Sequence, residues 1–122
     1  MMSVVDENKL YAIKFPGRSE PIELVMYVTT NFRNFPGICY YTAGNRGHMI
    51  EGHLGENTDR GFLFYPDNRS GGKPWEFIEM TYDFFKSGFY KHIECGEKLL
   101  DEFSNTEEME EWYHRAFPRR QL

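Results

Sequence analysis

Hydrophobic and polar residues alternate along the first two thirds of the chain in short runs that end at turn residues. The run 9–15 stops at Pro16 and Gly17, where the fixed φ of proline and the permissive φ of glycine favour a turn. Similar runs follow at 38–42, 48–54 and 62–65, separated by glycine-rich or polar stretches. Short strands at intervals of about 8 to 12 residues are typical of an antiparallel meander.

The segment 22–30 is compatible with two structures. Alternate residues from Ile22 to Val28 would share one face of a strand. A helix that starts after Ser19 would instead group residues spaced three and four apart, namely Ile22, Val25, Met26 and Thr29. We favour the strand, because threonine, valine and tyrosine are poor helix formers and good strand formers.

After residue 73 the hydrophobic positions recur at helical spacing. The first predicted helix starts at Pro74, whose missing N–H costs nothing in a first turn, and ends at Gly88. A second helix is predicted within 89–103. Gly96 interrupts this segment, and glycine weakens a helix interior by about 1 kcal/mol relative to alanine. In an alternative interpretation the helix therefore starts only near Gly96.

The last predicted helix has the clearest signals. Asn105 or Thr106 caps it, acidic residues occupy its first turn, and Pro118 ends it. Its apolar stripe has the spacing of a helix that docks on a core, and consists of Met109, Trp112, Tyr113, Ala116 and Phe117. Because Trp112 lies in the middle of this stripe, we expect it to be largely buried.

Together these patterns predict one α+β domain over residues 1–122. In this fold an antiparallel sheet of four to five strands fills the N-terminal two thirds, and two to three C-terminal helices pack on it. A chain of 122 residues buries roughly two thirds of its unfolded surface, which is enough for one core. Aromatic residues make up 17% of the chain, so some of them can also form an exposed binding patch.

The net charge of −5 is unevenly distributed. Residues 1–74 carry eight basic and eight acidic side chains, whereas residues 75–114 carry three basic and eleven acidic ones. An acidic half repels nucleic acid and favours a basic protein partner, although a solvated helix face has the same composition. The candidate partner-binding residues are Glu97, Asp101, Glu102, Glu107, Glu108, Glu110 and Glu111.

A second candidate site uses basic turn residues. Alternate turns of a meander lie at the same end of the sheet, so cations from the first, third and fifth turns would form a rim that binds a phosphate or carboxylate. These residues are Arg18, Arg46, Arg69 and Lys73. They are also compatible with ordinary solvated turns. Gly71–Lys73 does not complete a P-loop, because Asp67 replaces its first glycine and Pro74 replaces its Ser or Thr.

No catalytic, metal or cofactor motif is present, and we expect a binding protein without a cofactor rather than an enzyme. His48 and His53 are five residues apart, which in a strand points them to opposite faces. No nucleophile motif surrounds either cysteine, and Cys39 and Cys95 are expected to be free, buried thiols, with one disulfide as the alternative.

The chain carries no signal-peptide pattern and no apolar run of about 18 residues, so we expect a cytoplasmic protein without membrane contact. A small, acidic, aromatic chain without motifs is similar in composition to toxin-immunity proteins and phage-encoded inhibitors. The similarity implies an inhibitor that neutralises a basic partner such as a nuclease toxin. The alternative is a small anionic-ligand-binding domain or minor enzyme that uses the basic rim.

Overall fold

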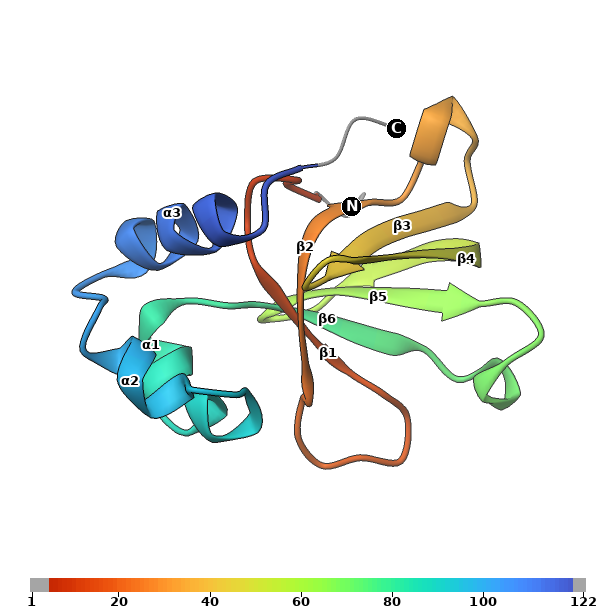
Figure 1. Cartoon of the computed structure of the whole chain (residues 1–122). Coiled ribbons are helices and arrows are strands. Elements are labelled where there is room, and N and C mark those ends of the chain that lie inside the picture. Colours follow the sequence, from red (N-terminus) through yellow and green to blue (C-terminus); the bar gives the residue numbers. More distant parts are fainter. Residues whose placement is uncertain (1–4, 120–122) are drawn as a thin grey trace.

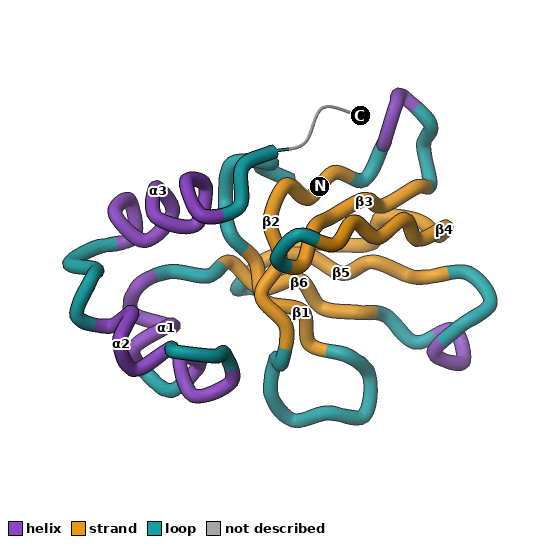
Figure 2. The backbone as a smooth tube through the Cα atoms, in the orientation of Figure 1, coloured by secondary structure: helices purple, strands orange, loops and turns teal. Residues whose placement is uncertain are grey.

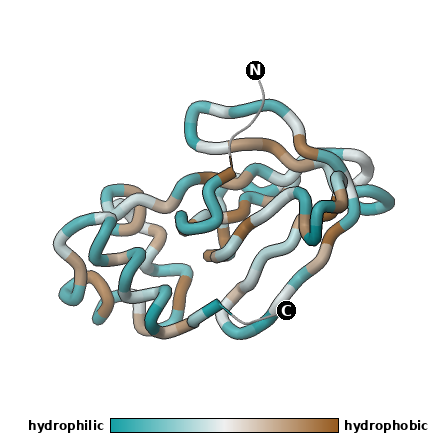
Figure 3. The backbone as a smooth tube through the Cα atoms, turned by 90° about the horizontal axis from the view of Figure 1, so that it is seen from above, coloured by the Kyte–Doolittle hydropathy of each residue, from teal (hydrophilic) through white to brown (hydrophobic). Residues whose placement is uncertain are grey.

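A computed structural model describes residues 5–119 as a closed barrel of six antiparallel strands with short helices at its side (Figures 1 and 2). Each strand pairs with its neighbours in sequence, and β1 pairs with β6 to close the barrel. The view from above again places the helices on one side (Figure 3). The strands are β1 (Tyr11–Lys14), β2 (Glu23–Thr29), β3 (Ile38–Ala43), β4 (Arg46–Asn57), β5 (Gly61–Pro66) and β6 (Trp75–Glu79).

The predicted sheet of four to five strands packed by helices is therefore wrong, and the sixth strand is the main reason. β6 occupies residues that were predicted as the start of a helix. Trp75 and Phe77 point into the barrel, and Glu76 and Glu79 pair with Arg60 and Lys9 outside it. Hydrogen bonding to β1 and β5 on both edges outweighs the helical spacing of the sequence.

The segment 22–30 forms a strand, as favoured from its composition, but the strand contains an extra residue. Met26 pairs with Thr42 and Thr29 pairs with Tyr40, so three steps along β2 match two along β3. The extra residue is Tyr27, whose φ of 55° is left-handed. Met26 and Tyr27 consequently both point toward the helices, whereas the side chains before and after them point into the barrel.

The barrel interior is filled mainly by aromatic and β-branched side chains from all six strands. β4 contributes to both sides of the barrel, because its first half pairs with β3 and its second half with β5. The change occurs at Gly52, where a Cβ would overlap the carbonyl oxygen of Tyr65. Only glycine therefore allows β4 and β5 to approach this closely.

The described part of the C-terminal segment contains three α-helices, of which the first two are shorter than predicted. The helices are α1 (Tyr82–Lys86), α2 (Gly96–Leu100) and α3 (Thr106–Ala116), and the 3₁₀ turn η3 (Phe89–His92) lies between α1 and α2. Two further 3₁₀ turns, η1 (Phe32–Asn34) and η2 (Ser70–Gly72), lie in the β2–β3 and β5–β6 connections. The start of α2 at Gly96 agrees with the later of the two predicted starts, and a Cβ there would overlap the carbonyl oxygen of Tyr90. No helix within residues 5–119 combines the length and hydrophobicity needed to cross a bilayer.

Helix α3 matches its prediction closely. The Asn105 side chain accepts a hydrogen bond from the Glu108 N–H at 2.9 Å and caps the helix. The apolar stripe, except for Ala116, which is exposed, packs on the outer face of β1 and β2, where it forms a second hydrophobic core with α1 and η3. Met109 and Tyr113 are buried in this core, but Trp112 is only half-buried and contacts Phe103 and Tyr113 at its edge.

Met109→Ala should therefore destabilise the protein more than Trp112→Ala. Met109 is fully buried, and truncation of such a side chain costs about 2 to 5 kcal/mol, whereas Trp112 is partly exposed at the edge of the core and its truncation leaves no closed cavity. Urea unfolding of the two variants measures the difference. A larger loss for Trp112→Ala would contradict the assignment of Met109 to the centre of the second core.

Candidate functional site

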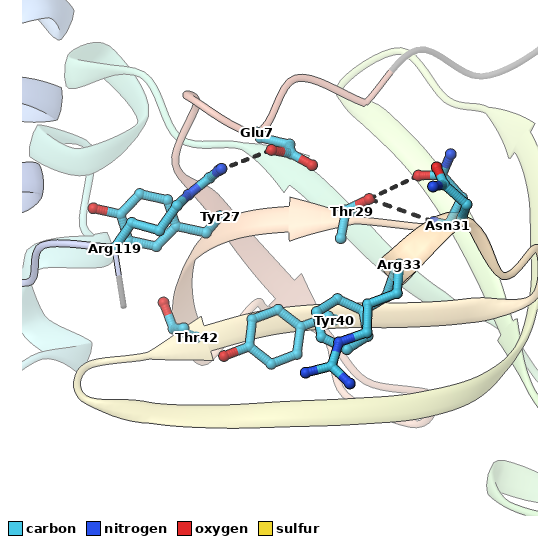
Figure 4. A pocket seen from close by; sticks show the side chains of 10 residues that line it. Glu7, Tyr27, Thr29, Asn31, Arg33, Tyr40, Thr42 and Arg119 are labelled. Atoms are coloured by element: carbon cyan, nitrogen blue, oxygen red, sulfur yellow. Dashed lines mark hydrogen bonds and ion pairs between the residues drawn. The ribbon is translucent and has the colours of Figure 1, made fainter. Parts of the chain in front are cut away.

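A groove of about 810 Å³ lies on the outer surface of β2 and β3 and reaches the edge of the second core at Tyr27 (Figure 4). The connection between β2 and β3 forms one end, and the segment after α3 forms the other. The groove is lined by Glu7, Tyr27, Thr29, Asn31, Phe32, Arg33, Asn34, Tyr40, Thr42 and Arg119. Its lining thus combines three aromatic rings, two guanidinium groups and several neutral hydrogen-bonding side chains.

Two of the rings are stacked and form a fixed wall. The rings of Phe32 and Tyr40 are nearly parallel, with centroids 4.6 Å apart. The Tyr40 phenol lies across β4 at Gly47, where a Cβ would be 2.6 Å from its hydroxyl. Both residues are partly buried and line the groove, so part of the stack is open to it.

Next to this wall is the most exposed hydrophobic surface of the described chain. Phe35, in the same β2–β3 connection, is 62% exposed, and Met49, the cross-strand partner of Tyr40, is 60% exposed. No other large hydrophobic residue within residues 5–119 is exposed to this degree. Exposed aromatic residues, methionine and arginine are the residue types enriched at binding interfaces.

Arg33 carries the free positive charge of the groove. Its guanidinium carbon lies 5.2 Å from the centroid of the Phe32 ring, and no carboxylate of the described chain pairs with it. A cation over an aromatic face remains available for an anion. The backbone of Arg33 and Asn34 is left-handed, with φ of 55° and 65°.

Unusual backbone conformations concentrate in this groove. Five non-glycine residues within residues 5–119 have a left-handed φ, and three of them, Tyr27, Arg33 and Asn34, line the groove. Each such residue costs of order 1 kcal/mol or more, which the surrounding structure must offset. Strained residues gather at binding and catalytic sites because the strain fixes side chains in the position that a ligand needs.

Arg119 forms the opposite end of the groove. Its guanidinium lies over the Tyr27 ring at 5.0 Å, and its Nη2 pairs with Oε2 of Glu7 at 2.8 Å. The charge of Arg119 is thus neutralised, in contrast to that of Arg33. Figure 4 shows this pair on the left and Asn31 at the far right with Thr29 between them, and the Arg33 guanidinium lies below, beside the Tyr40 ring.

The segment after α3 is anchored through the extra residue of β2. The Tyr27 hydroxyl donates to the Phe117 carbonyl oxygen at 2.8 Å, and Nδ1 of His114 lies 3.1 Å from the same hydroxyl. Nε2 of His114 lies 2.8 Å from the Asn8 carbonyl oxygen. Burial raises the pKa of Tyr27, so the hydroxyl keeps its proton for this contact.

These contacts place an acceptor opposite each nitrogen of His114. The Tyr27 proton is used at Phe117, and the Asn8 carbonyl has no proton to give. His114 thus joins the N-terminal segment, β2 and α3 at a single side chain.

The predicted partner-binding carboxylates lie on and around α2 and α3, outside the groove. Glu108 accepts a hydrogen bond from the Ser104 N–H at 3.0 Å, and Glu111 lies 3.9 Å from Arg115. Glu110 is half-buried. The other four are exposed and form no ion pair within the described chain, and these are Glu97, Asp101, Glu102 and Glu107.

The four predicted rim cations lie in the expected turns. Arg18 is in the β1–β2 connection, Arg46 begins β4, and Arg69 and Lys73 are in the β5–β6 connection. All four are exposed and none lines the groove. In Figure 1 the β1–β2 and β5–β6 connections extend from the barrel at separate places. The free arginine of the groove is instead Arg33, from a connection at the other end of β2.

Other predicted candidates have ordinary environments. Cys39 is buried in the barrel, and burial raises its pKa to about 12, whereas Cys95 is exposed rather than buried as expected; both thiols are free. His48 stacks on Tyr41 inside and His53 stacks on Tyr65 outside, so the two lie on opposite faces as predicted. Within residues 5–119 no cluster of His, Cys, Asp or Glu is suited to a metal.

The groove was missed in the sequence because its residues resemble a turn and a strand. Residues 31–37 contain Asn34, Pro36 and Gly37, which indicate a turn. The available signal was the presence of Phe32, Arg33 and Phe35 in the same short connection, where small polar residues are usual.

Comparison with known proteins gives no family: no protein-family model, no curated protein and no solved structure matches the chain.

Glu110→Gln should stabilise the protein at pH 7. Burial raises the pKa of Glu110, partly offset by His114 and by a hydrogen bond from the Leu10 N–H. A carboxyl whose pKa is higher in the folded state favours folding at low pH and loses that contribution as pH rises through the folded pKa. Glutamine keeps the acceptor oxygen without the charge.

Thermal unfolding at pH 7 and at pH 3.5 measures this effect. The variant should melt higher than the unmodified protein at pH 7, and the difference should shrink at pH 3.5, where the carboxyl is protonated in both states. Exposed Glu107→Gln serves as the matched control and should show no such pH-dependent gain. An equal or lower melting temperature for Glu110→Gln at pH 7 would contradict the burial argument.

Proposed function

We propose that the protein is a binding protein, not an enzyme, and that it holds an anionic ligand in the groove between the β2–β3 connection and Arg119. The observation that carries the proposal is the concentration of left-handed residues there: Tyr27, Arg33 and Asn34 are held in costly conformations around one groove. Arg33 supplies an unpaired guanidinium, and its neighbours supply rings and amide groups. We also propose a cytoplasmic location, because free cysteines are usual in a reducing compartment.

Arg33→Gly should abolish ligand binding without loss of stability. Glycine adopts the left-handed conformation freely, so relief of about 1 kcal/mol of strain offsets the backbone entropy of about 0.5 to 1 kcal/mol that glycine loses on folding. If Arg33 served only the fold, Arg33→Gly would leave ligand binding intact.

A thermal-shift screen of nucleotides, phosphosugars and small carboxylates tests this prediction. A ligand at about 100 times its Kd stabilises by roughly 2.7 kcal/mol, which a melting curve resolves. The shift should disappear in Arg33→Gly and persist in Arg18→Ala, a matched loss of one exposed arginine outside the groove. The proposal fails if no anion in the screen raises the melting temperature, or if Arg33→Gly keeps the shift.

The acidic helices support a second candidate function, an inhibitor that neutralises a basic protein such as a nuclease toxin. Its supporting observation is that Glu97, Asp101, Glu102 and Glu107 are exposed on neighbouring helical elements without ion pairs in the described chain. Negative charge of this kind accelerates association with a cationic surface and adds specificity.

Replacement of these four acidic residues by lysine should abolish the binding of a basic partner. The control reverses four exposed acidic residues of the barrel connections and strands, which gives the same net charge, at Glu20, Glu51, Asp59 and Asp67. Affinity purification from the native host at low and high salt measures the outcome. A basic partner should be retained by the unmodified protein and the control, and lost on helix reversal and at high salt. If both variants lose the partner equally, the net charge alone explains binding, and the specific role of the helix carboxylates is contradicted.

A further inference from the structure

We propose that the ligand of the groove is a nucleoside monophosphate, with the base against the aromatic wall and the phosphate on Arg33. This inference rests on the proposed function and adds the ligand class. The anion site and the ring site are neighbours: the Arg33 guanidinium carbon lies 5.2 Å from the Phe32 ring, which stacks at 4.6 Å on Tyr40. A ligand that uses both must carry a ring and an anion on one compact scaffold.

The groove lining has one unpaired cation, which favours a ligand with one phosphate over a polynucleotide. Arg33 is the unpaired cation of the groove lining, because Arg119 is held by Glu7 at 2.8 Å. A polynucleotide requires several phosphate contacts to bind at physiological salt, and the net charge of −5 repels it. A single phosphate requires one guanidinium, which binds two of its oxygens at once.

The remaining lining suits the other parts of such a ligand. Phe32 and Tyr40 are both partly exposed, and aromatic rings contact bases without a requirement for one sequence or base type. Asn31, Asn34 and Thr29 offer neutral donors and acceptors for the sugar hydroxyls and the base edge. The groove volume of about 810 Å³ is within the range of small-molecule sites.

Isothermal titration with adenosine and uridine 5′-monophosphates, adenosine, ribose 5-phosphate and inorganic phosphate tests the inference on the full chain. The monophosphates should bind at least about tenfold more tightly than adenosine or ribose 5-phosphate, because each fragment lacks one of the two contacts. Arg33→Gly should reduce monophosphate affinity to that of adenosine. Tyr40→Leu, which keeps an apolar side chain but removes the stacked ring, should reduce it to that of ribose 5-phosphate.

The outcomes separate this inference from the proposed function. If ribose 5-phosphate binds as tightly as the monophosphates and Arg33→Gly abolishes both, the anion site stands and the base site is refuted. If no phosphate compound or other anion binds, both are refuted. Adenosine that binds as tightly as its monophosphate would refute the role of Arg33. If a single-stranded oligonucleotide binds tenfold more tightly than the monophosphates, the mononucleotide assignment is refuted and the ligand is a nucleic acid.

Discussion

The pairing of β1 with β6 determines the arrangement of everything else in this structure. β1 has only four residues, yet it forms hydrogen bonds with β2 on one edge and with β6 on the other. Its inward residues, Tyr11 and Ile13, belong to the barrel core, and its outward neighbours, Leu10 and Ala12, belong to the core beneath the helices. Without this closure the barrel would have two open edges.

The groove depends on this framework in two ways. The barrel fixes β2 and β3, whose outer surface is its floor, and the helical layer positions the C-terminal segment that forms one end. Tyr27 joins the two, because its backbone belongs to β2 and its hydroxyl holds the Phe117 carbonyl. The free energy gained by packing in two hydrophobic cores is thus what allows three left-handed residues to persist at one place.

Local patterns predicted much of this fold, and long-range pairing decided the rest. The alternation in 9–15, 38–42, 48–54 and 62–65 was sufficient to find strands, and capping with apolar spacing was sufficient to find α3. Residues 75–79 fit both periods over so short a length, and only their partners β1 and β5 make them a strand. Barrel closure could not be predicted from local patterns either, because it pairs β1 with β6, whose residues are more than 60 positions apart in the sequence.

The candidate groove could not be predicted from the sequence. The rim of basic turn residues contributes no side chain to the groove lining, and Arg33 lies at the other end of β2 from Arg18. The position of Arg119 beside Glu7 joins the two ends of the described chain, and no local pattern contains that information. The left-handed backbone of Arg33 and Asn34 could not be predicted either, since arginine rarely adopts this conformation and asparagine does so mainly in turns.

The extra residue in β2 serves the attachment between the two layers of this protein and not the barrel itself. A β2 that lacked Tyr27 would run Val25, Met26, Val28 with regular alternation, so both valines would still face the barrel interior. The barrel is therefore complete without Tyr27, whereas the attachment of the C-terminal segment is not. Loss of this one residue would therefore leave the barrel pattern intact and remove the hydroxyl that holds the Phe117 carbonyl at one end of the groove.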